Sequence, residues 1–207
     1  FEQSIKESEA VWMQEIRATE PYAKIELEKT DVAADKVLNS HSTENVIYAL
    51  LLSPDGVYKM SQEIKGMVQT SLNLGTAYLD ADKLVYKYLI RSNTAAGKKL
   101  LLERVTTFAK HLSGKVVTMS DYPAWEYKSD SQLRRICVES FTNVYGHEPE
   151  VTSIHAGLEC GILAGKMPGV DMISFGPTLE SVHTPDECMN VASVERTWEY
   201  LPVSYTH

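Results

Sequence analysis

Apolar residues recur along the chain at two different spacings, which separate expected helices from expected strands. Helical spacing predicts helices at residues 2–17, 46–52, 94–112, 131–145, 157–164 and 190–201. Alternation and short apolar runs predict strands from residue 57 and at residues 24–29, 66–74, 83–91, 115–119, 151–154 and 171–174. Gly114 and Gly146 are expected to cap the helices before them, and Pro21 and Pro202 to end theirs.

The order of these expected elements changes near residue 117. Before it, the mixture of helices and strands is typical of helices packed on one face of an antiparallel sheet. After it, strands and helices alternate, beyond a turn-rich segment at residues 120–131. The sequence therefore predicts an α/β protein in two parts: an α+β part at residues 1–117 and a strand–helix part at residues 118–207.

Composition narrows the possible partners. The net charge of −8 and the absence of a basic stripe argue against nucleic acid. No apolar run approaches the roughly 20 residues of a membrane span. The three cysteines, Cys137, Cys160 and Cys188, are scattered without a CxxC spacing, which favours a reducing compartment over a disulfide framework. A cytoplasmic protein with no membrane contact is expected.

Two polar clusters stand in the apolar last third of the chain. The first is His155-Ala-Gly-Leu-Glu-Cys-Gly, and the second begins at His183 and continues Thr-Pro-Asp-Glu. An expected strand runs into Gly176 and Pro177 before His183, which would leave the imidazole at a rim where ligands bind. Neutral imidazole is a common zinc ligand, although a lone histidine in a loop is more often simply exposed.

The order of several motifs gives the chain a family resemblance. Together with the two clusters, these are the segments at residues 60–66, 70–75, 90–92, 121–125, 171–177 and 193–198. From about Asn45 onward, the sequence resembles the carboxy-terminal part of aminoacyl-histidine dipeptidases, also called Xaa-His dipeptidases or peptidase D. These are dinuclear zinc peptidases whose catalytic domain is interrupted by a lid, or dimerisation, domain. The resemblance implies that residues 1–117 belong to the lid and residues 118–207 to the catalytic domain.

The resemblance also implies which part of the zinc site the chain contains. The family's last zinc ligand falls on His183, as one ligand of a site that holds two zinc ions. The chain has no His-x-Asp motif and no Glu-Glu pair. The remaining ligands and the general base, a glutamate by resemblance, are therefore expected upstream of Phe1, and no catalytic residue is expected within the chain.

The expected substrate contacts come from both parts of the chain. The resemblance implies that the loop with His155, Gly157 and Glu159 contacts substrate, and the Glu159 carboxylate would pair with the free α-ammonium of a dipeptide. Glu159 equally suits the first turn of a helix, where the macrodipole favours an anion. On the lid, the resemblance places Arg91 on the substrate carboxylate, across a dimer in related enzymes, and Asn73 near the substrate.

These inferences predict that the intact parent protein is a zinc-dependent dipeptidase that hydrolyses unblocked dipeptides of the Xaa-His type by metal-activated water, and that this fragment alone is inactive. Its partners would be the dipeptide, a second copy bound through the lid, and the missing amino-terminal catalytic segment. One alternative is an isolated, non-catalytic dimerisation and substrate-gripping fragment. Another is a tripeptidase or amidohydrolase of the same superfamily.

Overall fold

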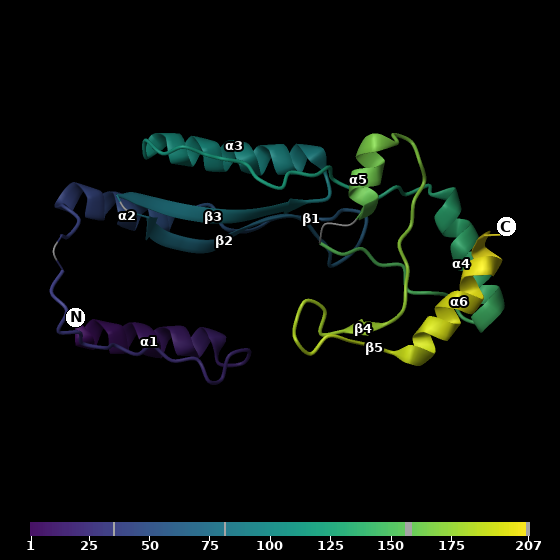
Figure 1. The fold of residues 1–207 in the computed structure, drawn as a ribbon, viewed down its shortest axis with the longest axis horizontal. Coiled ribbons are helices and arrows are strands. Elements are labelled where there is room, and N and C mark those ends of the chain that lie inside the picture. Colours follow the sequence, from purple (N-terminus) through teal and green to yellow (C-terminus); the bar gives the residue numbers. More distant parts are fainter. Residues whose placement is uncertain (35, 81, 156–158, 206–207) are drawn as a thin grey trace. The chain divides into compact units, whose positions relative to one another are not determined.

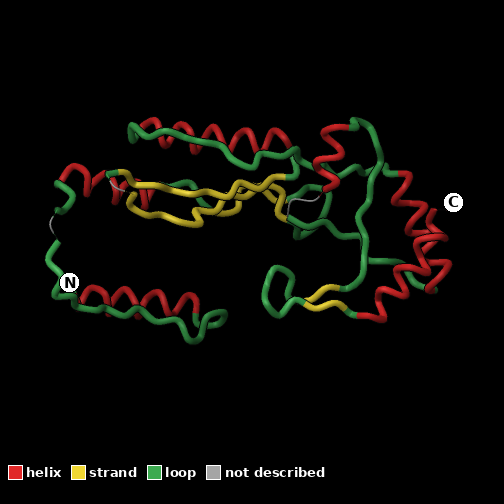
Figure 2. The backbone as a smooth tube through the Cα atoms, viewed as in Figure 1, coloured by secondary structure: helices red, strands yellow, loops and turns green. Residues whose placement is uncertain are grey.

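Helix α1 (Glu2–Ile16) opens the chain and confirms the first expected helix (Figures 1 and 2). The computed structural model describes residues 1–34, 36–80, 82–155 and 159–205. The chain divides into two units, Phe1–Ser42 and Thr43–His207, and the fold is mixed α/β with small antiparallel sheets. The division at residues 117 and 118 stays a prediction. No helix in the described part of the chain is long and apolar enough to cross a membrane.

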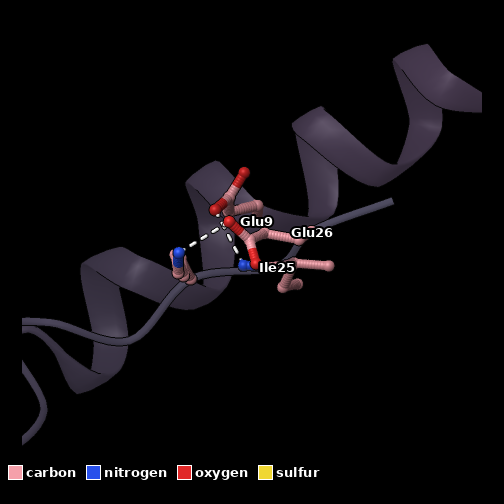
Figure 3. Close-up of polar contacts among 4 residues, drawn as sticks. Glu9, Ile25 and Glu26 are labelled. Atoms are coloured by element: carbon pink, nitrogen blue, oxygen red, sulfur yellow. Dashed lines mark hydrogen bonds and ion pairs between the residues drawn. The ribbon is translucent and has the colours of Figure 1, made fainter. Parts of the chain in front are cut away.

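The segment Lys24–Lys29 of the first unit is not the strand that its alternation predicts. A strand needs a neighbour to take up its backbone hydrogen bonds, and no strand lies among the described residues of this unit. A side chain takes that place, because the Ile25 N–H donates to Glu9 Oε1 on α1 at 2.9 Å (Figure 3). Beside it, Lys24 Nζ donates to Glu26 Oε1 at 2.6 Å.

Three antiparallel strands form the main sheet of the second unit. They are β1 (Gly56–Met60), β2 (Val68–Asp80) and β3 (Lys83–Ser92), in that spatial order. The long β2–β3 pair confirms the two expected strands and the change of direction between Asp80 and Lys83. Ser71 pairs with Arg91, and Leu72 pairs with Ile90. Successive pairs point to opposite faces of the sheet, so these two pairs do as well.

Helix α3 (Ala95–His111) covers one face of this sheet (Figure 1). Leu101 and Val105 pack on Leu72 from the sheet, and together they form the buried core of this region. The Thr94 side chain caps the helix by accepting the Gly97 N–H at 3.2 Å. At the other end Gly114 donates to the Ala109 carbonyl at 2.7 Å, but the left-handed residue is Ser113 (φ 56°), where glycine would be expected.

Two helices further along the second unit pack on one another (Figure 1). They are α4 (Gln132–Tyr145), closed by Gly146 at φ 74°, and α6 (Val191–Tyr205). The Tyr200 hydroxyl donates to the Cys137 carbonyl at 2.7 Å, and the Tyr200 ring contacts those of Phe141 and Phe175. The prediction that Pro202 ends the last helix is wrong. A proline lacks one N–H, and α6 continues to Tyr205 without that donor.

The other elements are helix α2 (Ser40–Leu52), helix α5 (Glu159–Lys166) and the small hairpin of β4 (Leu179–Glu180) and β5 (Cys188–Met189). Helix α2 confirms the expected helix at residues 46–52 and begins earlier. The strands predicted at residues 115–119, 151–154 and 171–174 are absent. Among the described residues, strands pair only within β1–β3 and within β4–β5, so these three segments have no neighbouring strand.

Asp171, in one of the segments expected as a strand, binds the start of α4 instead. Its Oδ2 accepts the Ser131 hydroxyl at 2.9 Å and the Leu133 N–H at 3.0 Å. Burial acts to raise the pKa of this carboxyl. The hydrogen bonds from Leu133 and Ser131 and the charge of Lys128 outweigh burial, and the pKa lies below its ordinary value. The carboxylate therefore serves as an anion at the helix amino terminus.

We expect Asp171→Asn to lower the free energy of unfolding by about 0.5 kcal/mol at pH 7, because the amide keeps an acceptor oxygen but loses the negative charge that a helix amino terminus favours. Because the folded-state pKa lies below the unfolded value of about 3.9, this stabilisation is present above about pH 4 and disappears on further acidification. Urea unfolding at pH 7 and pH 3 measures it. Asp130→Asn, at an exposed neighbouring residue, is the control. A gap between Asp171→Asn and wild type that stays constant down to pH 3 would contradict the prediction.

Candidate functional site

The face of the main sheet opposite α3 carries three polar residues of interest. Leu72 and Ile90 point toward α3, so the neighbouring Ser71 and Arg91 point the other way. Asn73 lies two residues along β2 from Ser71 and shares its face. The two lid residues that the resemblance singled out, Arg91 and Asn73, therefore lie on one face, next to a serine that the sequence reasoning did not name.

His155 meets this face at two points. Its Nε2 lies 2.7 Å from the Ser71 hydroxyl, and its carbonyl oxygen accepts a hydrogen bond from Arg91 Nη1 at 2.7 Å. The structure thus brings together residues that are 84 and 64 positions apart in the sequence. Asn73 is exposed, and among the described residues it makes no hydrogen bond to His155 or Arg91.

The surroundings of His155 keep its imidazole ring neutral. Burial first, and then the positive charge of Arg91, lower the pKa of the imidazole below its ordinary value of 6.5. At neutral pH the ring therefore offers one N–H donor and one lone pair. An uncharged imidazole beside a guanidinium suits an anionic or strongly polarised ligand group.

We expect Arg91→Gln to raise the pKa of His155 toward 6.5, because one of the two causes of the lowered value is removed. An NMR titration of the imidazole resonances measures this change. Arg91→Lys keeps the charge and is expected to keep the pKa low. In wild type, the lowered folded-state pKa means that stability falls as the pH drops below about 6.5, where the unfolded state binds the proton first. An unchanged pKa in Arg91→Gln would assign the shift to burial alone.

The rest of the first cluster leads into α5. Glu159 is exposed and begins the helix, in the first turn that favours an acidic residue. This placement fits both the helix-start and the substrate interpretation, and Gly157 lies outside the described residues. Gly161 and Gly165 share one face of α5 and leave room for Pro123. A Cβ added at Gly161 would lie 2.9 Å from the Pro123 carbonyl oxygen, and a Cβ added at Gly165 would lie 2.5 Å from Pro123 Cγ. The small size of Gly161 therefore serves packing.

His183 lies in the loop between β4 and β5, exposed and in the left-handed region at φ 66°. The backbone N–H of His183 donates to Glu187 Oε2 at 2.8 Å, and the Thr184 hydroxyl donates to the Ser181 carbonyl at 2.7 Å. Ser181 is left-handed too, at φ 52°. Few residues other than glycine adopt this conformation, and such strain often accompanies function. A buried strand was expected to lead to His183, and a two-residue strand with exposed side chains takes its place.

The chemistry of this loop fits one metal ligand but not a complete site. An exposed imidazole whose backbone is fixed by a carboxylate suits zinc or a related ion. Residues 1–34, 36–80, 82–155 and 159–205 contain no group of three or more histidine, cysteine or acidic side chains that could hold a metal together. His183 is thus a single candidate ligand, and the assignment stays a prediction.

Comparisons with known proteins find similar chains among dipeptidases. The cytosol non-specific dipeptidase of Escherichia coli (strain K12) is 33% identical over 171 residues, which are 82% of this chain and 35% of that protein. The crystal structure of aminoacylhistidine dipeptidase from Vibrio alginolyticus superposes with a TM-score of 0.80 at 32% identity, over 95% of this chain and 40% of the other. The chain therefore spans little more than a third of the length of these relatives.

A more distant structure shares the fold alone. Aminopeptidase PepT from Bacillus cereus ATCC 10987 matches with a TM-score of 0.51 at 17% identity, over 79% of this chain and 44% of that chain.

Residues 13–202, nearly the whole chain, match the sequence profile of peptidase family M20/M25/M40. The chain belongs to this family of metal-dependent hydrolases.

Proposed function

We propose that the chain supplies the substrate-gripping part of a zinc-dependent dipeptidase that cleaves unblocked dipeptides, with a preference for Xaa-His. The observation that carries the proposal is the contact of His155 with the Ser71–Arg91 pair, which joins the first polar cluster to the sheet. The names of the two more similar relatives agree on dipeptides and differ on the residue cleaved. The preference for Xaa-His is therefore supported by one of the two names.

The charges of the site match the two ends of a dipeptide. Arg91 has five N–H donors, and one nitrogen binds the His155 carbonyl, so its charge and other donors are proposed to hold the substrate carboxylate. Glu159, exposed at the start of α5, is proposed to pair with the α-ammonium. Asn73 on the same face as Arg91 would add an amide. A substrate with a blocked amino group would lose the Glu159 pair.

The metal chemistry of the proposed reaction has one candidate ligand here. A zinc ion polarises the scissile carbonyl and lowers the pKa of its bound water. His183 would contribute a neutral imidazole, oriented by the fixed backbone of its loop. The other ligands of the two zinc ions and the general base are proposed to come from a segment outside this chain.

The assembly and location of the protein are also proposals. We place a homodimer contact on the lid, at residues 1–117, which would let Arg91 serve the site of the partner. The relative named as a cytosol dipeptidase supports a cytoplasmic location. The acidic charge of −8 supports the absence of a nucleic-acid partner.

A second candidate function is a non-catalytic gripping and dimerisation fragment. The observation that favours it is that the described residues hold only isolated metal-ligand candidates. The two candidates differ in what the chain does once the segment with the remaining zinc ligands is supplied: the dipeptidase part would complete an active enzyme, whereas the non-catalytic fragment would still hydrolyse nothing. A tripeptidase or amidohydrolase activity is the third candidate, and a substrate panel separates it from the dipeptidase.

The test is hydrolysis of free and amino-acetylated dipeptides by the purified protein with added zinc, preceded by an intact-mass spectrum that identifies every polypeptide present. Where a polypeptide that supplies the remaining zinc ligands and the base is present, we expect free Xaa-His dipeptides to be cleaved and acetylated ones to be cleaved at least about tenfold less well, the value of one charged pair. This chain alone should hydrolyse nothing. Glu159→Gln should remove this discrimination. Equal cleavage of blocked substrates would contradict the role of Glu159, and cleavage of tripeptides alone would contradict the dipeptidase proposal.

A further inference from the structure

We propose that Ser71 is a positioning residue of this site: its hydroxyl sets the orientation of the His155 ring, while Arg91 sets the His155 main chain, so that Nδ1 faces the substrate. The inference rests on the proposed function, in which His155 contacts the dipeptide. It adds a role for a residue that lies within the family-like segment at residues 70–75 but was not expected at the site.

The two hydrogen bonds act on different parts of His155. Ser71 binds the ring at Nε2, and Arg91 binds the carbonyl oxygen, each at 2.7 Å. The carbonyl contact alone would leave the side-chain torsions of His155 free to rotate. The ring contact alone would leave the main chain of the loop free to shift. Together they fix both the position of the residue and the plane of its imidazole.

The platform for these contacts is itself well fixed. Ser71 and Arg91 are directly opposed on β2 and β3. The preceding pair, Thr70 and Ser92, is joined by a hydroxyl hydrogen bond of 2.9 Å. The following pair contains Leu72, which is 1% exposed in the core under α3. Because both neighbouring pairs are fixed, the hydroxyl that reaches His155 has little freedom to follow a moving ring.

Engaging Nε2 decides which ring nitrogen is left for a ligand. The Ser71 hydroxyl can donate to Nε2 or accept from it, so it occupies this nitrogen in either tautomer and leaves the other nitrogen for a ligand. Among the described residues Ser71 is the partner of Nε2, and no hydrogen bond is made to Nδ1. The ring is therefore held with Nδ1 available to the substrate. Without the hydroxyl, the ring would be free to flip.

The experiment compares Ser71→Ala, Ser71→Thr and Thr76→Ala in the full chain. Threonine keeps the hydroxyl, and Thr76 is an exposed residue of the same strand whose loss should leave His155 unchanged. The first measurement is the ¹⁵N chemical shifts of the two His155 ring nitrogens by NMR, which respond to the hydrogen bond at each nitrogen. Only six histidines contribute signals, and His155→Gln assigns the right one. We expect a changed Nε2 shift in Ser71→Ala alone.

The second measurement is dipeptide hydrolysis by the same variants, each assembled with the segment that supplies the remaining zinc ligands and the base. We expect KM to rise about five- to tenfold in Ser71→Ala, the fold-change of one hydrogen bond, with kcat changed less and with recovery in Ser71→Thr. Unchanged ring shifts in Ser71→Ala would overturn the proposal. A loss of stability with equal changes in KM and kcat, and no rescue by threonine, would overturn it as well. If wild type cleaves no dipeptide, the proposed function fails, while the ring shifts still decide the role of Ser71.

Discussion

Leu101→Ala is expected to lower the free energy of unfolding by about 3 kcal/mol, within the range of about 2–5 kcal/mol for deleting a buried leucine side chain. Leu101 is fully buried, at 0% exposure, and packs between α3 and the sheet against Leu72 and Val105. Three half-buried side chains, Tyr58, Tyr88 and Ile90, surround them. Alanine at this position would leave a cavity between α3 and the sheet. Neither element can move far enough to fill it, because each is held by its other packing contacts.

The neighbouring leucine provides a matched control. Leu100 lies on the same helix but is 51% exposed, so Leu100→Ala should change stability by no more than about 0.5 kcal/mol. Urea unfolding measures both variants, and an unchanged m-value would show that the folded and unfolded states keep their compactness. Equal losses in the two variants would contradict the assignment of this core.

This core is also the support of the candidate site. Along β2, the buried Leu72 alternates with Ser71 and Asn73, so the residue that packs under α3 separates the two that face the loop. A destabilised core would loosen the pairing of Ser71 with Arg91, and with it the two contacts to His155. We therefore infer that packing against α3 on one face of the sheet fixes the positions of Ser71 and Arg91 on the other face, where they bind His155.

The sequence predicted those elements whose stability depends on local pattern. Helices such as α3 and α4 follow from apolar spacing and their caps, because a helix satisfies its own backbone. The β2–β3 pair follows from alternation in two adjacent segments that can reach one another across a short turn. The segments at residues 24–29, 115–119, 151–154 and 171–174 have comparable patterns but no neighbouring strand among the described residues. Strand formation depends on a partner, which a local pattern does not specify.

The contacts of the candidate site were also not predictable from local sequence pattern alone. His155 and Arg91 were expected near substrate on the strength of the resemblance, and their mutual contact across 64 residues was not foreseen. Ser71 carried one usable signal: it lies two residues before Asn73 on an alternating strand and so had to share its face. The left-handed backbone of His183 carried none, since histidine adopts this conformation more often than most residues but still in only a small share of cases.

His183→Gly is expected to separate stability from function. A left-handed residue other than glycine costs roughly 1–2 kcal/mol, and glycine loses about 0.5–1 kcal/mol more conformational freedom on folding. The free energy of unfolding should therefore stay constant or rise by up to about 1 kcal/mol. If His183 is a zinc ligand, zinc affinity and hydrolysis should fall by more than about a hundredfold, because loss of even a residue that merely supports a ligand costs 10- to 100-fold.

Ser181→Gly is the matched control for that experiment. Ser181 lies in the same β4–β5 loop at φ 52°, and its interaction with Thr184 uses the main-chain carbonyl, which glycine retains. The substitution should therefore relieve the same kind of strain and leave zinc binding and hydrolysis at the wild-type level. Calorimetric zinc titration and urea unfolding of both variants measure the two effects. If both variants gain stability and both keep zinc affinity, the left-handed His183 is a feature of the hairpin alone. A loss of zinc affinity confined to His183→Gly would mean that the loop tolerates a strained backbone because an imidazole is needed at that position.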